Sequence, residues 1–440
     1  MKTISKLVLA VSAACVALCG AMGQTSGSNS PFSRYGWGTL ADESMGFNKG
    51  MAGLALGMHD SLSLNRQNPA AYSEMCSQTL IFDAGISLQN CMLKSGGKTI
   101  NAQNSSVDYI AAGFRLAPGL GFSLGLRPFS YVGYNFSTSS NLDDIDGYGS
   151  KTASSTYYGD GGFRQIYMGV GYKVLKPLSV GMNVNYIWGE YQHSSSMSYS
   201  DNNVQSLTRN YKANINAPTL DFGAQYQHRI DAKNTVTLGV TYGLGFKINQ
   251  KARFINTQSG SGDTSTPDTM SVDDAFALPN KVAVGATWNH ENRWTVGADY
   301  SIEFWDKCRF PWLRTTKTGT TYAVGKGYLR NRHKLTVGAE YVPNPRGYKI
   351  KDHIAYRAGA SYSTAYTKVG NGRDGAEYLL VSAGVGLPIV NKYSTRSVLN
   401  ISAQWEHAAS QDLKGLKEDY LRLCIGLTFN ATWFNKWKFE

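Results

Sequence analysis

Residues 421–430, which read LRLCIGLTFN, decide the fold of this chain. In a β-strand successive side chains point to opposite faces, so this stretch has two different faces. The apolar face carries Leu421, Leu423, Ile425, Leu427 and Phe429. The opposite face carries Arg422, Cys424, Gly426, Thr428 and Asn430. Such a strand near the C-terminus, followed by the aromatic residues Trp433, Phe434, Trp437 and Phe439, is typical of a transmembrane β-barrel.

The same alternation recurs along the chain and predicts fourteen strands. We place them at residues 79–89, 106–116, 119–132, 161–174, 177–189, 216–229, 234–248, 279–289, 292–306, 333–342, 353–364, 376–387, 397–406 and 418–430. Their apolar faces suit lipid, and their Gly-, Ser- and Asn-rich faces suit a lumen.

The connections between these strands form a second pattern. Connections after even-numbered strands are short, at residues 117–118, 175–176, 230–233, 290–291 and 388–396, with 343–352 of middling length. Most connections after odd-numbered strands are long, at residues 90–105, 133–160, 190–215, 249–278 and 307–332. Short periplasmic turns that alternate with long outer loops are typical of outer-membrane barrels. We therefore predict an all-β fold, a 14-stranded antiparallel barrel in the outer membrane of a Gram-negative bacterium.

The chain before the first strand divides into two parts. Residues 1–23 have a basic start, an apolar run and a small-residue cleavage site, which predicts a signal peptide. Residues 24–78 are rich in Gly, Ser, Met and Asn without a regular period, and we expect them to form a plug inside the barrel. The barrel would then span residues 79–430, and residues 431–440 would form a periplasmic aromatic tail.

Composition and charge exclude several classes of protein. No run of about 18 apolar residues follows the signal peptide, which excludes a helical membrane protein. The net charge of +12 is scattered along the chain, so nucleic acid is not an expected partner. Solvated loops and a wet lumen account for these charges; attraction to outer-membrane lipid, especially anionic lipopolysaccharide, is the alternative.

We find no catalytic motif and expect neither an enzyme nor a cofactor. None of the seven histidines belongs to a nucleophile motif. Residues 143–149, DDIDGYG, resemble a calcium loop but lack its remaining ligands, so no metal site is expected. Cys91 and Cys308 would both lie at the outer rim, where a disulfide between them is one alternative. Residues 60–62 and 268–270 fit a short O-glycosylation pattern.

Residues 44–72, SMGFNKGMAGLALGMHDSLSLNRQNPAAY, resemble the segment that precedes the first strand in the long-chain fatty-acid transporter (FadL) family. The matching positions are Gly50, Gly53, Asn68, Pro69 and Ala70. The resemblance implies a plugged 14-stranded barrel in which Asn68, Pro69 and Ala70 hold the plug. Relatives of this kind take up hydrophobic compounds by diffusion or, like PorV of type IX secretion, bind protein partners.

The third predicted strand contains Pro128, which cannot donate a backbone hydrogen bond. In that family a kinked third strand opens a lateral gap, and Gly125 and Gly133 would ease such a bend here. The alternative is that Pro128 lies where the strand leaves the membrane and nothing opens.

These observations lead to two expectations of function. The first is passive uptake of a hydrophobic or amphipathic small molecule, with Met51, Leu54, Leu56, Phe129 and Tyr131 as ligand-binding residues. The second is a structural barrel that docks protein partners of a secretion or outer-membrane assembly machine. A general porin for polar solutes is disfavoured because the plug would occlude the pore.

Overall fold

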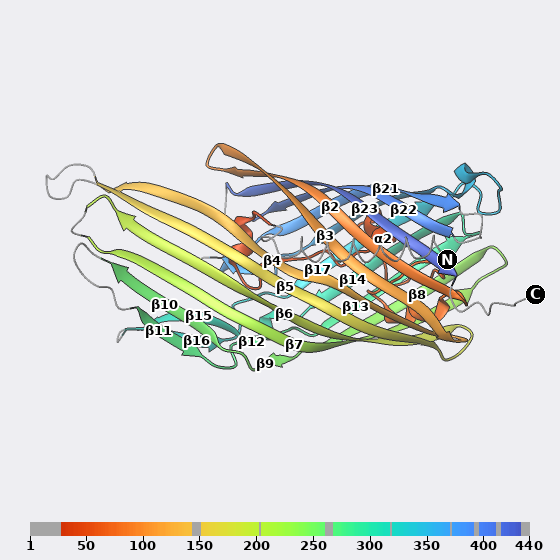
Figure 1. Ribbon diagram of the computed structural model, residues 1–440, viewed down its shortest axis with the longest axis horizontal. Helices are drawn as coiled ribbons and strands as arrows, with labels where there is room; N and C mark the ends of the chain where they lie inside the picture. The colour runs from red at the N-terminus through yellow and green to blue at the C-terminus, as the bar shows by residue number, and fades with distance from the viewer. Residues whose placement is uncertain are drawn as a thin grey trace, which may run out of the picture.

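The computed structural model describes residues 28–142, 151–201, 204–259, 267–316, 319–369, 372–390, 396–410 and 415–432. The predicted signal peptide, the residues 143–149 and the aromatic residues after Thr432 lie outside this part of the chain. Within it, residues 28–78 precede a closed antiparallel β-barrel (Figure 1).

The predicted number of fourteen barrel strands is confirmed. Each strand pairs with the next along the chain, and the last pairs with the first from Thr79↔Thr432 to Lys94↔Lys417, which closes the barrel. The strands are β2 (Thr79–Ser95), β3 (Lys98–Ala117), β4 (Leu120–Leu142), β5 (Lys151–Lys173), β6 (Leu178–Tyr199), β7 (Ser206–Arg229), β8 (Asn234–Leu244), β13 (Lys281–His290), β14 (Trp294–Glu303), β17 (Arg332–Tyr341), β18 (Ala355–Ser363), β21 (Glu377–Val390), β22 (Arg396–Ala409) and β23 (Lys417–Thr432).

The two faces of β23 point as its sequence requires. Leu421, Leu423 and Leu427 are 57%, 43% and 40% exposed, whereas Thr428 and Asn430 are buried inside the barrel. Other strands expose apolar residues in the same way, among them Val184, Leu238, Val240, Val296, Val337 and Val381. An outward apolar band around a closed barrel is the surface that faces lipid in an outer membrane. No helix in the described residues is long and apolar enough to cross a membrane.

The long outer loops expected at residues 90–105, 133–160 and 190–215 are wrong as loops, because the strands continue through much of them. β2 and β3 meet at a turn at Gly96 and Gly97, while β4 to β7 are 22 to 24 residues long. A membrane crossing needs only about 9–11 residues, so these strands project far beyond it (Figure 1). Outside lipid a strand needs no apolar outward face, so hydrophobic alternation did not reveal these extensions.

A hairpin of β10 (Ala252–Ser259) and β11 (Asp268–Val272) lies along the extension of β7. We call the outer parts of β4 to β7, together with β10 and β11, the outer wall. The remaining outer elements are the paired strands β9 (Lys247–Ile248) and β12 (Phe276–Ala277), η3 (Trp305–Lys307), the hairpin β15 (Phe310–Thr316) and β16 (Gly319–Gly325), and the pair β19 (Lys368–Val369) and β20 (Arg373–Asp374). A short 3-10 helix, η4 (Ile350–His353), lies in the connection between β17 and β18, at the opposite end of the barrel.

The N-terminal segment, residues 28–78, lies inside the barrel and is called the plug below. It contains η1 (Pro31–Arg34), β1 (Thr39–Leu40), α2 (Gly46–Lys49) and η2 (Pro69–Glu74). Many of its large buried apolar side chains, among them Phe32, Trp37 and Met51, belong to three apolar clusters that it shares with the barrel wall. Both Cys91 and Cys308 are buried free thiols, each in a different cluster, so a disulfide between them is wrong.

Candidate functional site

The plug rests on lumen-facing glycines of the barrel wall. A Cβ on Gly181 would lie 2.4 Å from the carbonyl carbon of Pro69. A Cβ on Gly121 would lie 1.9 Å from the backbone carbonyl oxygen of Tyr72. Gly121, Gly171, Gly181 and Gly223 are directly opposite one another on β4, β5, β6 and β7, so they form one row across the sheet. Any side chain in this row would occupy the volume that η2 fills.

The row of glycines continues around the barrel. A Cβ on Gly239 would lie 1.9 Å from the Leu56 oxygen, and one on Gly359 would lie 2.4 Å from the Met51 carbonyl carbon. Together these positions form what we call the glycine seat, which comprises Gly121, Gly171, Gly181, Gly223, Gly239, Gly285, Gly297, Gly338, Gly359, Gly384 and Gly426. The seat brings the plug close against the wall along β4 to β8, β13, β14, β17, β18, β21 and β23.

Asn68 connects the plug to itself and to the wall. Its side-chain oxygen accepts a hydrogen bond from Ala70 N–H (3.2 Å), which caps η2. Its side-chain nitrogen donates to the oxygens of Leu56 (2.9 Å) and Ala224 (3.2 Å). Pro69 is the first residue of η2, where its missing N–H leaves no donor unsatisfied. The matched motif therefore lies on the wall of β5 to β7, beside Gly181 and Gly223.

The other two matched glycines serve the same packing. Gly50 lies against Gly384, where a Cβ would be 3.2 Å from the Gly384 Cα. Gly53 has φ +90°, a conformation that favours glycine, and lets the chain turn back after α2.

Ion pairs hold the plug at the level above the seat. Lys49, which is buried, bonds Asp108 of β3 (3.1 Å) and Asp42 of the plug (3.4 Å). Glu43 bonds Lys281 of β13 (2.7 Å) and Arg127 of β4 (3.5 Å). These bonds hold the pKa of the Glu43 carboxyl well below its usual value, against the opposing effect of burial. The pairs with Asp108, Lys281 and Arg127 join the plug to β3, β13 and β4, whereas Lys49–Asp42 lies within the plug.

A second set of polar contacts fixes the plug at its other end. His59 contacts Gln225 of β7 through Nδ1 (2.9 Å) and Glu74 through Nε2 (3.3 Å). Glu74 also pairs with Lys173 at the end of β5. These bonds lower the pKa of Glu74 to about 2, the hydrogen bond from His59 being the main cause. The connections at this end of the barrel are the short ones, so it is the periplasmic end.

Two cavities lie between the plug and the barrel wall in the described residues, and each is lined by both charged and apolar groups. The larger, of about 160 Å³, is lined by charged residues that include Asp42, Glu43, Lys49, Asp108, Arg332 and Lys334. The smaller, of about 110 Å³, is lined by Arg66, Arg127 and Asp221 together with apolar groups such as Phe129. Charged walls of both signs retain water and favour polar contents.

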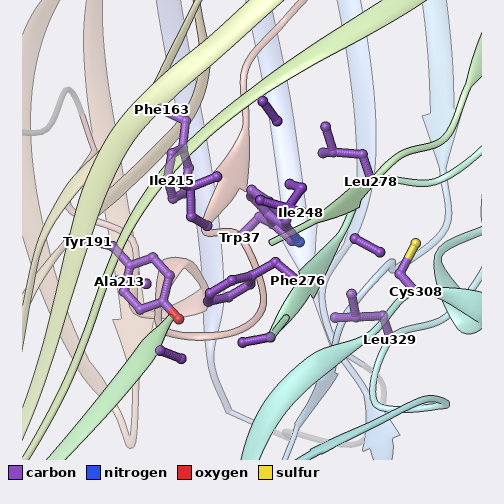
Figure 2. Packing of buried hydrophobic residues seen from close by; sticks show 14 of the residues in the cluster. Trp37, Phe163, Tyr191, Ala213, Ile215, Ile248, Phe276, Leu278, Cys308 and Leu329 are labelled. Carbon is purple, nitrogen blue, oxygen red and sulfur yellow. The ribbon is translucent and has the colours of Figure 1, made fainter. Parts of the chain in front are cut away.

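A cluster of buried aromatic and aliphatic side chains surrounds Trp37 of the plug inside the barrel (Figure 2). Trp37 of the plug is fully buried, with ring centroids 5.2 Å from Phe163 and 5.6 Å from Phe276. Trp305 of η3 lies 6.3 Å from the same ring. Residues of β5, β6, β7, β9 and β12 therefore converge on one plug side chain, and we call this group the outer seal.

The wall is interrupted between β3 and β4. Their ladder runs from Ala117↔Leu120 to Ile110↔Leu126, and both strands then continue without a register between them in the described residues. Pro128 follows two residues after the last pair, and Phe129 bulges out of the ladder with β5. We call this interruption the β3–β4 seam. Gly125 lies within the last paired stretch, and Gly133 lies beyond the bulge.

The plug covers the lower part of the β4 edge at this seam. Thr39 and Leu40 of β1 pair antiparallel with Tyr131 and Ser130. The Ser130 hydroxyl donates to the Trp37 oxygen (2.7 Å), and Gly133 N–H donates to the Ser33 hydroxyl (3.1 Å). The edge of β4 just after Pro128 is therefore covered by β1 and neighbouring residues of the plug.

The five residues predicted to bind a ligand do not come together. Met51 and Leu54 have no exposed surface and pack against the glycine seat, in an apolar cluster with Tyr72 and Ile81. Leu56 and Tyr131 reach the larger cavity, and Phe129 reaches the smaller one beside the outer seal. Sequence reasoning missed the glycine seat and the ion pairs. Glycines on the polar faces of successive strands were a visible signal for the seat, but their common level depends on strand register.

Comparisons with known proteins agree with this fold. Residues 3–440 match the family model described as BamG. No curated protein matched the sequence.

Solved structures with the same fold include three similar chains. The toluene transporter TbuX of Ralstonia pickettii is 15% identical, with a TM-score of 0.59 over 90% of this chain and 99% of that one. A FadL homologue of Pseudomonas aeruginosa is 14% identical, with a TM-score of 0.58 over 90% and 100%. The Pseudomonas putida toluene transporter TodX is 12% identical, with a TM-score of 0.56 over 89% and 99%. The chain therefore has the FadL-like outer-membrane barrel fold, and fold alone does not decide function.

Proposed function

The chain belongs to the BamG family, and from this premise we propose that it is a closed outer-membrane barrel that docks protein partners of an assembly or secretion machine. The glycine seat carries this proposal. A plug that meets the wall backbone to backbone at Gly121, Gly181 and Gly359 cannot slide past these three positions without separating from the wall. A barrel filled in this way acts through its surface.

The contents of the lumen support the same proposal. An apolar solute gains free energy by leaving water for apolar surroundings, at roughly 25 cal/mol per Å². The larger cavity is lined by charged residues, among them Asp42, Glu43, Lys49 and Arg332, mixed with apolar ones such as Leu40 and Leu380, so an apolar solute there would meet charged groups as well as apolar surface. The outer seal around Trp37 closes the route from outside. Passage of a hydrophobic compound would require the seal, the ion pairs and the seat to separate.

The outer wall supplies a surface for partners. β4 to β7 project on one side of the barrel, whereas β13, β14, β17 and β18 have 9 or 10 residues each. The projection is thus confined to part of the circumference (Figure 1). Such asymmetry gives a partner one defined side on which to dock.

Native mass spectrometry of the protein purified in mild detergent from cells that make it tests the proposal. We expect a barrel without stoichiometric hydrophobe, accompanied by defined proteins in a fixed ratio. A stoichiometric hydrophobe that is lost in Phe129→Asp but retained in a control, Tyr158→Asp on the exposed surface of β5, would contradict the docking role.

A second function, passive uptake of a hydrophobic small molecule, is favoured by the β3–β4 seam. The ladder ends at Ile110↔Leu126 within the membrane-spanning part of the wall, beside Pro128 and Phe129. The similar chains named above include toluene transporters. In this alternative the seam would release ligand sideways after β1 leaves the β4 edge.

A disulfide tether separates the two functions. Thr39→Cys with Tyr131→Cys joins directly opposed residues of β1 and β4. If the seam must open, oxidation should reduce uptake of toluene by whole cells and reduction should restore it, with each single cysteine variant as a control. A docking barrel should behave identically in both states.

A further inference from the structure

The upper part of β4 has no strand beside it on the side that faces the seam, in the described residues. β5 covers the other side of β4 up to Leu142↔Lys151, and β1 covers the seam side only at Ser130 and Tyr131. Above Gly133, no register to a further strand exists on the seam side in the described residues. We call residues 134–141, which read YNFSTSSN, the open edge.

The direction of the backbone groups on the open edge follows from the plug contacts. Phe129 accepts a hydrogen bond from Ala41 N–H (2.9 Å), and Gly133 uses both its N–H and its oxygen to bond Ser33. In an antiparallel ladder the N–H and C=O of alternate residues point to the same side. The ladder with β5 is regular from Ser130 to Leu142. The residues that present paired donors and acceptors to the seam are therefore Asn135, Ser137, Ser139 and Asn141, all of them exposed.

The open edge lacks the features that normally protect such an edge. Natural sheets block free edges with lysine, proline, bulges or covering segments. Residues 134–141 contain no charge, no proline and no glycine, and their ladder has no bulge. Because Tyr134 is the fifteenth residue of a strand that needs about 9–11 residues to cross the membrane, this edge lies outside lipid.

The plug itself does not cover this edge. Its segment before Ser33 turns away from β4, because Ser30 donates to Glu418 of β23 (2.7 Å) and Asn29 donates to Asn104 of β3 (3.3 Å). These contacts carry the chain across the seam to the opposite wall. Just below the open edge, β1 pairs with β4 at Ser130 and Tyr131 in the antiparallel direction. The same side of β4 therefore accepts an added antiparallel strand.

We propose that the open edge binds an extended segment of another protein by β-strand addition, antiparallel to β4 and running from outside toward the membrane. This inference rests on the docking function and names the surface and the chemistry of the partner. Main-chain hydrogen bonds to Asn135, Ser137, Ser139 and Asn141 supply the affinity. The partner segment needs alternating N–H and C=O groups, without proline at the paired positions.

Topology distinguishes such a partner from a second copy of the chain. In one membrane, two copies related by a two-fold axis along the membrane normal both direct β4 outward. Their edges would meet as parallel strands, whereas β1 sets the antiparallel mode. A segment that descends toward the membrane is therefore not the β4 edge of a second copy, and we assign it to another protein.

Site-specific photo-crosslinking in cells that make the protein tests this site. A benzoylphenylalanine probe is placed in turn at Ser137, Ser139 and Asn141, with Tyr158 on the exposed surface of β5 as the control position. We expect crosslinks to one partner segment in which each step of two residues forward on β4 moves the attachment two residues backward on the partner. Peptide mass spectrometry reads this register.

Paired variants then separate main-chain from side-chain binding. Ser137→Pro with Ser139→Pro removes two seam-facing N–H donors without removing a donor from the β5 ladder, so the barrel should still fold and migrate as a folded species in unheated gels. Binding should be lost in this variant and kept in Ser137→Ala with Ser139→Ala. Crosslinks to β3 of the same chain, to a second copy, or to no protein would overturn the inference.

The outcome also distinguishes this inference from the docking function. If defined partners co-purify with the proline variant as they do with the unaltered protein, the open edge is not their site although docking remains. If no protein co-purifies with the unaltered chain and a hydrophobe does, the docking function itself fails.

Discussion

Gly181 of β6 and Pro69 of the plug are packed so closely that a Cβ on the glycine would lie 2.4 Å from the Pro69 carbonyl carbon. The two backbones belong to segments more than 100 residues apart in the chain. Because the two backbones are in contact, a larger side chain at Gly181 would displace the plug segment around Pro69.

Replacing this glycine should therefore displace the plug. We expect Gly181→Leu to keep the folded barrel, because its ladder bonds are unchanged, but to raise single-channel conductance in planar bilayers. Val180→Leu, one residue away on the lipid side, is the matched control and should leave conductance at the level of the unaltered protein. Equal conductance in all three proteins would show that the seat does not hold the plug.

The ion pairs of Lys49 should contribute strongly to stability. Lys49→Met leaves Asp42 and Asp108 without their shared partner, and breaking a buried pair costs about 3–5 kcal/mol. The side chain of Lys49 is 6% exposed, whereas that of Lys94, which pairs with Asp419, is 52% exposed. Lys94→Met should cost about 0–1 kcal/mol. Thermal unfolding followed on gels should show a larger loss of stability for Lys49→Met than for Lys94→Met. Similar losses of stability in the two variants would refute a buried role for Lys49.

Glu74 should make stability depend on acidity. Its pKa is lowered in the folded protein from 4.5 to about 2, so its ionised form stabilises the fold. That contribution is complete above about pH 4.5 and is lost as the pH falls toward 2. Unfolding measured from pH 6 to 2 should show a steeper loss for the unaltered protein than for Glu74→Gln. Glu190→Gln, at an exposed position, should retain the steeper loss.

The outer seal should depend on the size of its central ring. Trp37→Ala removes contacts to Phe163, Phe276 and Trp305, and truncating a buried tryptophan costs about 3–5 kcal/mol. Trp37→Phe keeps an aromatic ring and should lose less. We expect the melting temperature to fall in the order unaltered, Phe, Ala, with added uptake of a large antibiotic only in Trp37→Ala. Unchanged antibiotic uptake in Trp37→Ala would show that passage is blocked nearer the periplasmic end than the outer seal.

The local sequence was enough to specify the barrel. Alternation with a period of two is a property of each strand alone, so residues 421–430 revealed their lipid and lumen faces without any partner. The lengths of the connections, which are also read directly from the sequence, indicated which end of the barrel faces the periplasm. The extensions of β4 to β7 escaped prediction because strands outside lipid pair through their backbones and need no apolar face.

Only the tertiary structure decided what fills the barrel. The glycine seat depends on register, which places Gly121, Gly171, Gly181 and Gly223 opposite one another although no local pattern aligns them. The bond between Ser30 and Glu418 joins residues 388 positions apart. The sequence by itself determined the wall, because a strand's two faces are set by neighbouring residues. The plug, its ion pairs and the open edge were decided by closure of the barrel, which alone brings distant residues to one level.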